Sequence, residues 1–346
     1  MEKRLKKLQI EKKILFISCC IAFAQIACVK NMSTQPLTPS TSTIGQIIQQ
    51  GTNLSILDSA MSKSGLLATL DSTNSGGAPF TLFAPVNTAF MNAGIYDSNI
   101  AKDSVSYLRR LMAYHLYAGN ANTVADWYGL IGNMRNYPIQ SASGDYFYLT
   151  IDSTGFYVNG YAVTQTDVIA KNGVIQALSG VLIPPNGSIY QTLVSLSTSS
   201  DTSLSFIVAA IQRASQGFNQ INLTSLLSSS GQYIDSTYTF FAPTNAAFMA
   251  IGDSSIAAIQ QIPIDSLNRL LLTNIIPGQV FSSDFPLDSV RFSYAGDSLF
   301  FSTILGNTIT SVGDSSISAS IIQTNILATN GLIHIVNQIL YPYSPF

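Results

Sequence analysis

The side chains best suited to catalysis in this sequence are two histidines, His115 and His334. Histidine can act as a general base, and the abundant serines and aspartates could complete a Ser-His-Asp triad. The two histidines lie at different places in the two halves of the chain, however, and the sequence contains no HExxH, P-loop, GxSxG or EF-hand motif. We therefore expect no enzyme, no cofactor and no metal site, with a weak Asp/Ser-based hydrolase as an alternative.

Aromatic side chains form a second group of candidates, between residues 127 and 148. The only tryptophan of the chain and four tyrosines lie there: Trp127, Tyr128, Tyr137, Tyr146 and Tyr148. Rings with a polar edge suit the faces of sugars and the centres of protein interfaces. Strand alternation favours burial of alternate rings, so those that face outward would form a weak binding patch for carbohydrate or protein.

Cys28 is the third chemically distinctive residue. Residues 1–27 combine basic residues with an apolar run of 14 residues, which is typical of a signal peptide and shorter than the roughly 20 residues of a membrane span. The segment Gln25-Ile26-Ala27-Cys28 is similar to a bacterial lipoprotein cleavage site, although Gln25 replaces the usual leucine. The other cysteines, Cys19 and Cys20, lie within the apolar run. Acylation of Cys28 is therefore the simplest use of its thiol; alternatively, all three are ordinary residues of a signal peptide cleaved elsewhere.

These features predict an exported protein of the cell envelope, an outer-membrane or cell-surface lipoprotein held to the membrane by its N-terminal lipid. Residues 28–42, rich in Pro, Ser and Thr, form a flexible tether. Beyond Cys28, ten basic residues accompany sixteen aspartates and no glutamate, so there is no basic patch for nucleic acid. Eleven of these aspartates precede serine, a pair typical of helix N-caps and turns.

Helices are expected to open each half of the chain and strands to close it. Apolar spacing predicts a helix over residues 44–61, and another that follows Ser104 and carries His115 on its apolar face. Alternating side chains then predict a series of hairpins over residues 146–151, 156–158 and 161–163. Helices first and strands later indicate an α+β class.

The chain repeats itself at a distance of 158 residues. The pattern Phe-Ala-Pro-x-Asn-x-Ala-Phe occurs at residues 83–90 and 241–248, and Asn-Gly-x-Ile occurs at 172–175 and 330–333. So long a period exceeds that of solenoid repeats and predicts two self-sufficient domains. We interpret Phe-Ala-Pro as scaffold, in which Pro fixes the exit of a strand and the asparagine, Asn87 or Asn245, caps the next helix.

Both copies of these motifs resemble the fasciclin (FAS1) domain family, over residues 43–343. The resemblance implies two tandem FAS1 domains, at residues 43–185 and 186–346, each a wedge-shaped β-sandwich with helices packed on one side. In animal members of the family the Tyr-His neighbourhood is linked to integrin-mediated adhesion, which implies a binding role for Tyr114 and His115. His115 could instead bond a buried backbone group, and we favour this structural interpretation for His115 and for His334.

The sequence as a whole therefore favours a non-catalytic adhesion or binding lipoprotein. Its expected partner is an extracellular polysaccharide, or a matrix or other surface protein, and not a nucleic acid. The main alternative from another class is a structural assembly subunit of an envelope complex, in which the two copies pack against one stoichiometric partner.

Overall fold

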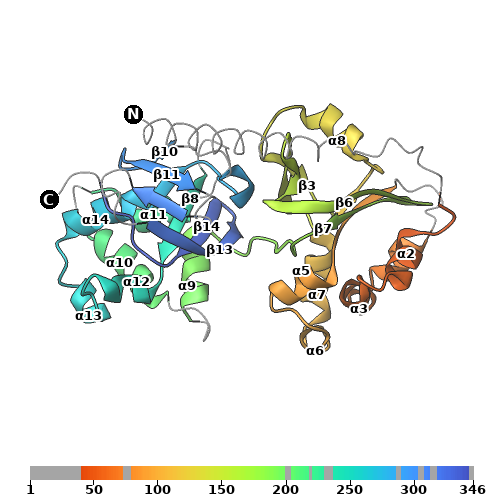
Figure 1. Ribbon diagram of the computed structural model, residues 1–346. Coiled ribbons are helices and arrows are strands. Elements are labelled where there is room, and N and C mark those ends of the chain that lie inside the picture. Colours follow the sequence, from red (N-terminus) through yellow and green to blue (C-terminus); the bar gives the residue numbers. More distant parts are fainter. Residues whose placement is uncertain are drawn as a thin grey trace, which may run out of the picture.

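The structure, a computed structural model, describes residues 40–72, 79–198, 204–217, 220–229, 237–285, 290–302, 308–311 and 318–342. Within these residues the chain forms two copies of one α+β unit, which lie side by side (Figure 1). The first copy runs from α2 to β7 and the second from α9 to β14. The predicted signal peptide, Cys28 and the tether up to residue 39 lie outside the described residues.

The elements follow the expected order, with most helices before most strands. The first copy contains α2 (Ile44–Gln50), α3 (Ser55–Ser64), α4 (Leu67–Asp71), β1 (Phe80–Pro85), α5 (Asn87–Asn92), α6 (Asp97–Ile100), α7 (Val105–Tyr114), β2 (Leu116–Ala118), α8 (Val124–Ile131), β3 (Tyr137–Gln140), β4 (Tyr146–Asp152), β5 (Gly155–Val158), β6 (Tyr161–Ala170) and β7 (Gly173–Leu178). The second contains α9 (Ile189–Ser197), α10 (Ser205–Ala214), α11 (Leu223–Ser228), β8 (Tyr238–Pro243), α12 (Asn245–Ala250), α13 (Ile256–Ile259), α14 (Ile264–Thr273), β9 (Ile275–Pro277), η3 (Ser282–Asp284), β10 (Val290–Phe292), β11 (Ser298–Ser302), β12 (Thr308–Ser311), β13 (Ser318–Ala328) and β14 (Gly331–Val336).

Each copy has a seven-stranded mixed sheet of the same topology. The order is β2-β1-β7-β6-β5-β4-β3 in the first copy, and the second follows the same path as β9-β8-β14-β13-β12-β11-β10. In both sheets the strand that carries the Phe-Ala-Pro motif pairs in parallel with the last strand, β1 with β7 and β8 with β14. The remaining pairs are antiparallel.

The sheet of each copy bends into a wedge. The long strands β6 and β13 both contain register shifts, and such bulges bend a strand and increase its twist. The bend brings the two ends of the first sheet face to face, because the rings of Phe83 on β1 and Phe147 on β4 lie 5.1 Å apart between centroids. On the opposite face of β1, Leu82 and Ala84 pack into a cluster with helical residues such as Ile48. The wedge-shaped sandwich with helices on one side is thus confirmed, with α8 as the exception, because its Trp127 packs with Phe83 on the other face.

Glycine is required where the last strand of each copy begins. A Cβ atom at Gly173 would lie 2.1 Å from the carbonyl oxygen of Phe80, and one at Gly331 would lie 1.8 Å from that of Tyr238. Only a residue without a side chain lets the parallel strands approach this closely. This explains the glycine of the repeated Asn-Gly-x-Ile motif.

The asparagine of the same motif caps the helix that opens its copy. Asn172 Oδ1 accepts a hydrogen bond from the Ile44 N–H group at 2.8 Å, and Asn172 Nδ2 donates to the Leu70 carbonyl at 2.7 Å. In the second copy, Asn330 Oδ1 accepts from the Ile189 N–H group at 2.8 Å. These side chains join the first helix of each copy to its last strand, and so satisfy an N–H group that a helix start leaves unpaired.

Two sequence expectations about the helices are wrong. The helix predicted over residues 44–61 is two helices, α2 and α3, because the chain leaves the helical path between Gly51 and Leu54. Asn87 and Asn245 cap earlier helices and not the helices that follow them. Asn87 Oδ1 accepts from the Ile56 N–H group of α3 at 3.1 Å, and Asn245 Oδ1 accepts from the Phe206 N–H group of α10 at 2.9 Å. The asparagine at the end of the Phe-Ala-Pro strand lies beside a helix that precedes this strand in the chain. Its neighbours in the sequence do not indicate this contact.

The two copies are less separate than two self-sufficient domains would be. Each copy buries an apolar cluster of its own beneath its helices. A further cluster surrounds Phe83 and Phe147 of the first copy and also includes Phe281, Leu327 and Leu332 of the second. The copies therefore share part of their apolar interior. Across the described ranges, none of the helices combines the length and apolarity needed to cross a bilayer.

Candidate functional site

His115 is fully buried at the end of α7, and both of its ring nitrogens are bonded. Nδ1 lies 2.8 Å from the carbonyl oxygen of Leu111, and Nε2 accepts from the Leu182 N–H group at 2.9 Å. Because a carbonyl can only accept, Nδ1 carries the proton and Nε2 does not. Burial lowers the pKa of His115 to about 4, so the ring is neutral near pH 7 and has no free nitrogen with which to act as a base.

Asn274 makes the corresponding bonds in the second copy. Its Nδ2 donates to the Leu270 carbonyl at 2.8 Å, and its Oδ1 accepts from the Leu340 N–H group at 3.2 Å. An amide thus replaces an imidazole between the same helical carbonyl and the same backbone N–H group. The structural interpretation of His115 is confirmed.

Tyr114, the other half of the Tyr-His pair, is also fully buried. Its hydroxyl donates to the Tyr146 carbonyl at 2.7 Å and accepts from Asn159 Nδ2 at 3.1 Å. Burial raises the pKa of Tyr114, so the phenol stays protonated. Tyr114 and His115 therefore lie inside the first copy and bond different parts of its backbone.

His334 has an amide counterpart in the first copy as well. Its Nε2 lies 2.9 Å from the Val280 carbonyl and its Nδ1 accepts from the Asn325 N–H group at 3.3 Å, while its ring stacks on Phe241. Burial lowers the pKa of His334 to about 4. Gln176 makes the same pair of bonds in the first copy, to the Asn122 carbonyl and from the Asp167 N–H group. The structural interpretation of His334 is confirmed too.

The aromatic candidates do not form one surface. Trp127 is fully buried against Tyr117, with 5.1 Å between ring centroids, whereas Tyr128 and Tyr146 are half exposed. Tyr137 and Tyr148 are partly buried on the paired strands β3 and β4. The Tyr148 ring packs against Phe281 of the second copy at 5.8 Å. The members of the stretch thus have three different environments: the core, the solvent and the contact between copies.

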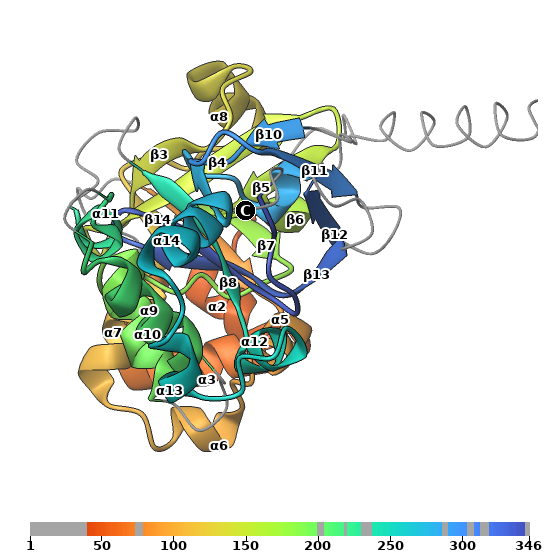
Figure 2. The same cartoon turned by 90° about the vertical axis from the view of Figure 1, so that its left-hand side faces the viewer.

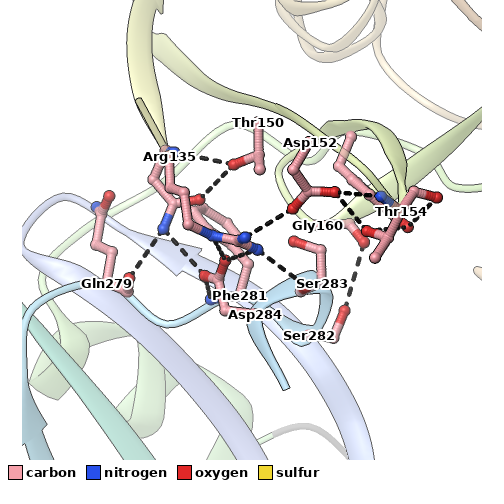
Figure 3. Close-up of polar contacts among 12 residues, drawn as sticks. Arg135, Thr150, Asp152, Thr154, Gly160, Gln279, Phe281, Ser282, Ser283 and Asp284 are labelled. Atoms are coloured by element: carbon pink, nitrogen blue, oxygen red, sulfur yellow. Dashed lines mark hydrogen bonds and ion pairs between the residues drawn. The ribbon is translucent and has the colours of Figure 1, made fainter. Parts of the chain in front are cut away.

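Arg135 lies at that contact and bridges the two copies (Figure 3). Its guanidinium lies 2.6 Å from Asp152 of the first copy and 2.8 Å from Asp284 of the second, and it also donates to the Ser283 carbonyl at 3.2 Å. The Asp284 side chain is only 4% exposed. A buried carboxylate is stable only when it is paired and hydrogen-bonded, so Arg135 is needed on the first copy as long as Asp284 is present on the second.

Asn136 completes the binding of Asp284. Its Nδ2 donates to Asp284 Oδ2 at 3.0 Å and to the Gln279 carbonyl at 3.1 Å, and the Phe281 N–H group donates to the same carboxylate oxygen at 2.8 Å. Both oxygens of Asp284 are therefore bonded. We call Arg135, Asn136, Asp152 and Asp284 the joint.

The connection between the copies is held by a second arginine. Arg110 on α7 pairs with Asp145 at 3.1 Å and donates to the Pro185 carbonyl at 2.7 Å. On the other side, the turn glycine Gly160 has a φ of 77°, and a Cβ there would lie 2.7 Å from Asn325 Nδ2 of the second copy. Arg110 thus holds the chain that leads into the second copy, and Gly160 lets the two copies approach closely.

Sequence reasoning missed the joint entirely. Arg135 and Asp284 are 149 residues apart, and neither belongs to a repeated motif. The scarcity of cations is the one usable signal, because in a chain with ten basic residues after Cys28 each arginine is a candidate for a specific bond. Within the described part of the chain, no group of three or more His, Cys, Asp or Glu residues could hold a metal ion.

The exchange of histidine for amide predicts a pH-dependent stability. The unfolded chain binds protons at His115 and His334 near pH 6.5, whereas the folded chain does so near pH 4. This contribution to stability is fully present above pH 6.5 and is lost as the pH falls towards 4, by about 3 kcal/mol for each histidine. The double variant His115→Asn/His334→Gln keeps the bonds and should lose less stability between pH 7 and pH 4, as measured by urea unfolding.

The matched control is the double variant His115→Leu/His334→Leu, which leaves backbone groups unpaired. It should be less stable at pH 7 by about 1–3 kcal/mol for each buried group left unpaired. Equal pH profiles for the wild type and the Asn/Gln variant would contradict the assignment, as would equal losses at pH 7 for the Asn/Gln and Leu variants.

Comparison with known proteins agrees with the repeated fold. The model of the Fasciclin domain matches residues 52–184 and 207–342. Stabilin-2 of Mus musculus is 35% identical over 128 residues, 34% of this chain and 5% of that protein. A fasciclin-like arabinogalactan protein of Arthroderma benhamiae is 24% identical over 270 residues, 76% of this chain and 58% of that protein. Human periostin is 26% identical over 266 residues, 76% of this chain and 27% of that protein.

A solved structure is similar as well. The FAS1 domain pair of the insect cell adhesion molecule fasciclin I aligns with 84% of this chain and 96% of its own length, at 16% identity and a TM-score of 0.37. Matches to the first relatives cover less than two thirds of those proteins. Two matches of one family model that together cover most of the sequence, on two copies of one fold, show that the chain belongs to the Fasciclin domain family.

Proposed function

We propose that the protein is a non-catalytic adhesion or binding module of the cell envelope, whose partner is a matrix or surface protein or an extracellular polysaccharide. One observation carries this proposal: a segment of the repeat that forms a protein contact in the second copy is exposed in the first. Membership of the Fasciclin domain family supports a binding role. The bonded, neutral state of both histidines supports it further, because neither ring can take a proton from a serine in this geometry.

The two segments correspond to each other at their starts. In the first copy the Thr123 N–H group donates to Asp126 at 2.9 Å, and in the second the Phe281 N–H group donates to Asp284 at 2.8 Å. The next N–H group also donates to the same position of the long bent strand at 2.9 Å, Val124 to Asp167 and Ser282 to Asn325. From there the first copy forms the eight-residue helix α8, whereas the second forms the short turn η3, which packs on the first copy.

Helix α8 is anchored by one face and carries large apolar side chains elsewhere. Its inner face buries Val124, Trp127 and Ile131. Tyr128 and Leu130 are 49% and 50% exposed, and Met134 just after the helix is 52% exposed. We call these three residues the α8 patch. Figures 1 and 2 both place α8 at the periphery of the molecule, away from the second copy's helices.

The α8 patch suits a protein partner because Leu and Met add apolar area without directional bonds, and aromatic rings such as that of Tyr128 are enriched in interfaces. Of the aromatic candidates, Tyr128 therefore has the clearest binding role in our proposal. Tyr146 is also half exposed and remains a candidate. Tyr114, His115 and Trp127 are assigned to the core, and Tyr148 to the contact between copies.

The first test removes the α8 patch. The triple variant Tyr128→Ser/Leu130→Ser/Met134→Ser should lose at least tenfold in binding to immobilised collagen, fibronectin or purified envelope polysaccharide, whichever the wild type binds, as measured by surface plasmon resonance. The matched control is Met249→Ser/Ile251→Ser/Ile256→Ser, which removes three similarly exposed apolar side chains from the second copy. It should bind as the wild type does.

Thermal unfolding of both triple variants checks that the fold is intact. Equal binding by the two variants would contradict a role for the α8 patch, and no binding of the wild type to any of the three surfaces would contradict adhesion. Purification of one stoichiometric envelope protein with the wild type, but not with the α8 variant, would favour the structural assembly alternative.

We also propose that Cys28 anchors the protein to the membrane through covalent lipid. A cysteine with two or three acyl chains binds a bilayer far more firmly than one with a single chain. Mass spectrometry of the mature protein should find an acylated N-terminal Cys28, and Cys28→Ser should remove the protein from the membrane fraction. Cys20→Ser is the matched control and should leave the protein in that fraction. An unmodified peptide that spans Ala27-Cys28 in the mature protein would contradict the anchor.

A further inference from the structure

A cavity of about 350 Å³ lies where the two copies meet, on the helix side of the joint. Tyr161 and Ile183 of the first copy form one wall. Gln191 and Ser195 on α9 and Gln323 on β13 of the second copy form the other. The cavity thus depends on the fixed position of one copy against the other.

The same groove occurs in the first copy, which indicates that it belongs to the fold. A smaller cavity of about 170 Å³ lies there between the opening helix and the bent strand, and its lining includes Ile47 and Gln165. At the repeat distance of 158 residues Gln165 corresponds to Gln323, and both lie within the register shifts of their strands. The bulge exposes one glutamine beside the first helix in each copy. Only in the second copy does a neighbouring copy close the groove and enlarge it.

The polar part of the lining of the larger cavity carries no charge. None of the residues that line it is Asp, Glu, Lys, Arg or His. The amide of Gln323 and the hydroxyl of Ser195 make no side-chain hydrogen bond to the described residues, and the Gln191 amide uses only its Oε1, for the Ser188 N–H group. Burial raises the pKa of Tyr161, so its hydroxyl remains a neutral donor. Phosphates, carboxylates and metal ions would find no counter-charge here.

Apolar side chains occupy the rest of the walls. Ile183, Ile326 and Leu327 line the cavity together with the Tyr161 ring. A ligand that matches both kinds of wall needs an apolar face and an uncharged edge that donates and accepts hydrogen bonds. A sugar ring has this chemistry, with C–H groups on its face and hydroxyls at its edge. The volume is near the lower end of the roughly 300–1,000 Å³ of ligand pockets, which suits one or two rings.

We infer that the cavity between the copies binds a neutral sugar, either free or as part of a polysaccharide. The Gln323 amide and the Nε2 group of Gln191 bond the hydroxyls, and the apolar wall with Tyr161 covers the ring face. This site is separate from the α8 patch and does not depend on it. It is also separate from the aromatic stretch that the sequence indicates for carbohydrate, because no member of that stretch lines the cavity.

The test uses saturation-transfer NMR on the folded two-copy protein. The probes are glucose, galactose, maltose and cellobiose as free sugars, dextran as a neutral polymer, and glucuronic acid and glucose 6-phosphate as charged sugars. At least one neutral probe should give saturation transfer with millimolar affinity, and the charged sugars should bind at least fivefold more weakly. A signal from dextran would identify a polysaccharide as the source of the ring, and signals from free sugars alone would identify a soluble sugar.

Two variants and a control place the binding in the cavity. Ser195→Trp puts a large ring over the cavity and should abolish the signal, and Gln323→Ala removes a free amide and should weaken binding at least threefold. Gln261→Ala removes another exposed glutamine, which does not line the cavity, and should leave sugar binding unchanged. Thermal unfolding confirms that each variant is folded. The inference is overturned if no neutral probe binds, if the charged sugars bind equally well, or if Gln323→Ala and Gln261→Ala bind alike.

Discussion

The buried carboxylate of Asp284 joins the two copies of the fold. Asp284 reaches from the second copy into the first and is almost completely removed from solvent, yet both of its oxygens are bonded by Arg135, Asn136 and the backbone. Removal of Arg135 would leave the Asp284 carboxylate buried without its cation. The cost is smaller than the about 3–5 kcal/mol of a fully buried pair, because the Arg135 side chain is 35% exposed and solvent screens it. Separation of the copies would expose Phe281 to solvent and would break the ion pair between Arg135 and Asp284. The angle between the copies is therefore part of the fold.

The fixed angle has two consequences for function. It forms the cavity between the copies, whose walls come from both copies. It also uses the segment around η3 for a contact within the chain, while the corresponding segment of the first copy forms α8 and remains at the surface. The same segment of the duplicated fold thus differs between the copies. In the second copy it contacts the neighbouring copy, and in the first it lies at the surface.

The fold could be predicted because its repeated residues satisfy demands that any copy of it must meet. Gly173 and Gly331 permit the close parallel pairing, and Asn172 and Asn330 hold the first helix on the last strand. The structural role of His115 could be predicted as well, from its place on an apolar helix face. The break between α2 and α3 has a local signal, since Gly51 ends α2, but apolar spacing alone does not reveal it. The true partner of Asn87 depends on which elements meet in space.

The joint and the cavity lay beyond sequence reasoning for a related reason. Arg135 and Asp284 come from different copies. Asp284 has a counterpart in Asp126, but the residue that corresponds to Arg135 is Ser293, so the repeat does not bring the two charges together. The free amide of Gln323 is one of many glutamines in the sequence. It gains significance only because a bulge in β13 and a wall from the first copy surround it.

The most direct test that the Arg135–Asp284 ion pair holds the two copies together is a double-mutant cycle on the free energy of unfolding, with Arg135→Met, Asp284→Asn and the combined variant. We predict one cooperative urea transition for the wild type and a coupling energy between the two residues of at least about 1.5 kcal/mol, as close charge pairs show at protein interfaces. Single-variant effects that add within about 0.5 kcal/mol, together with two separate transitions in the wild type, would contradict it.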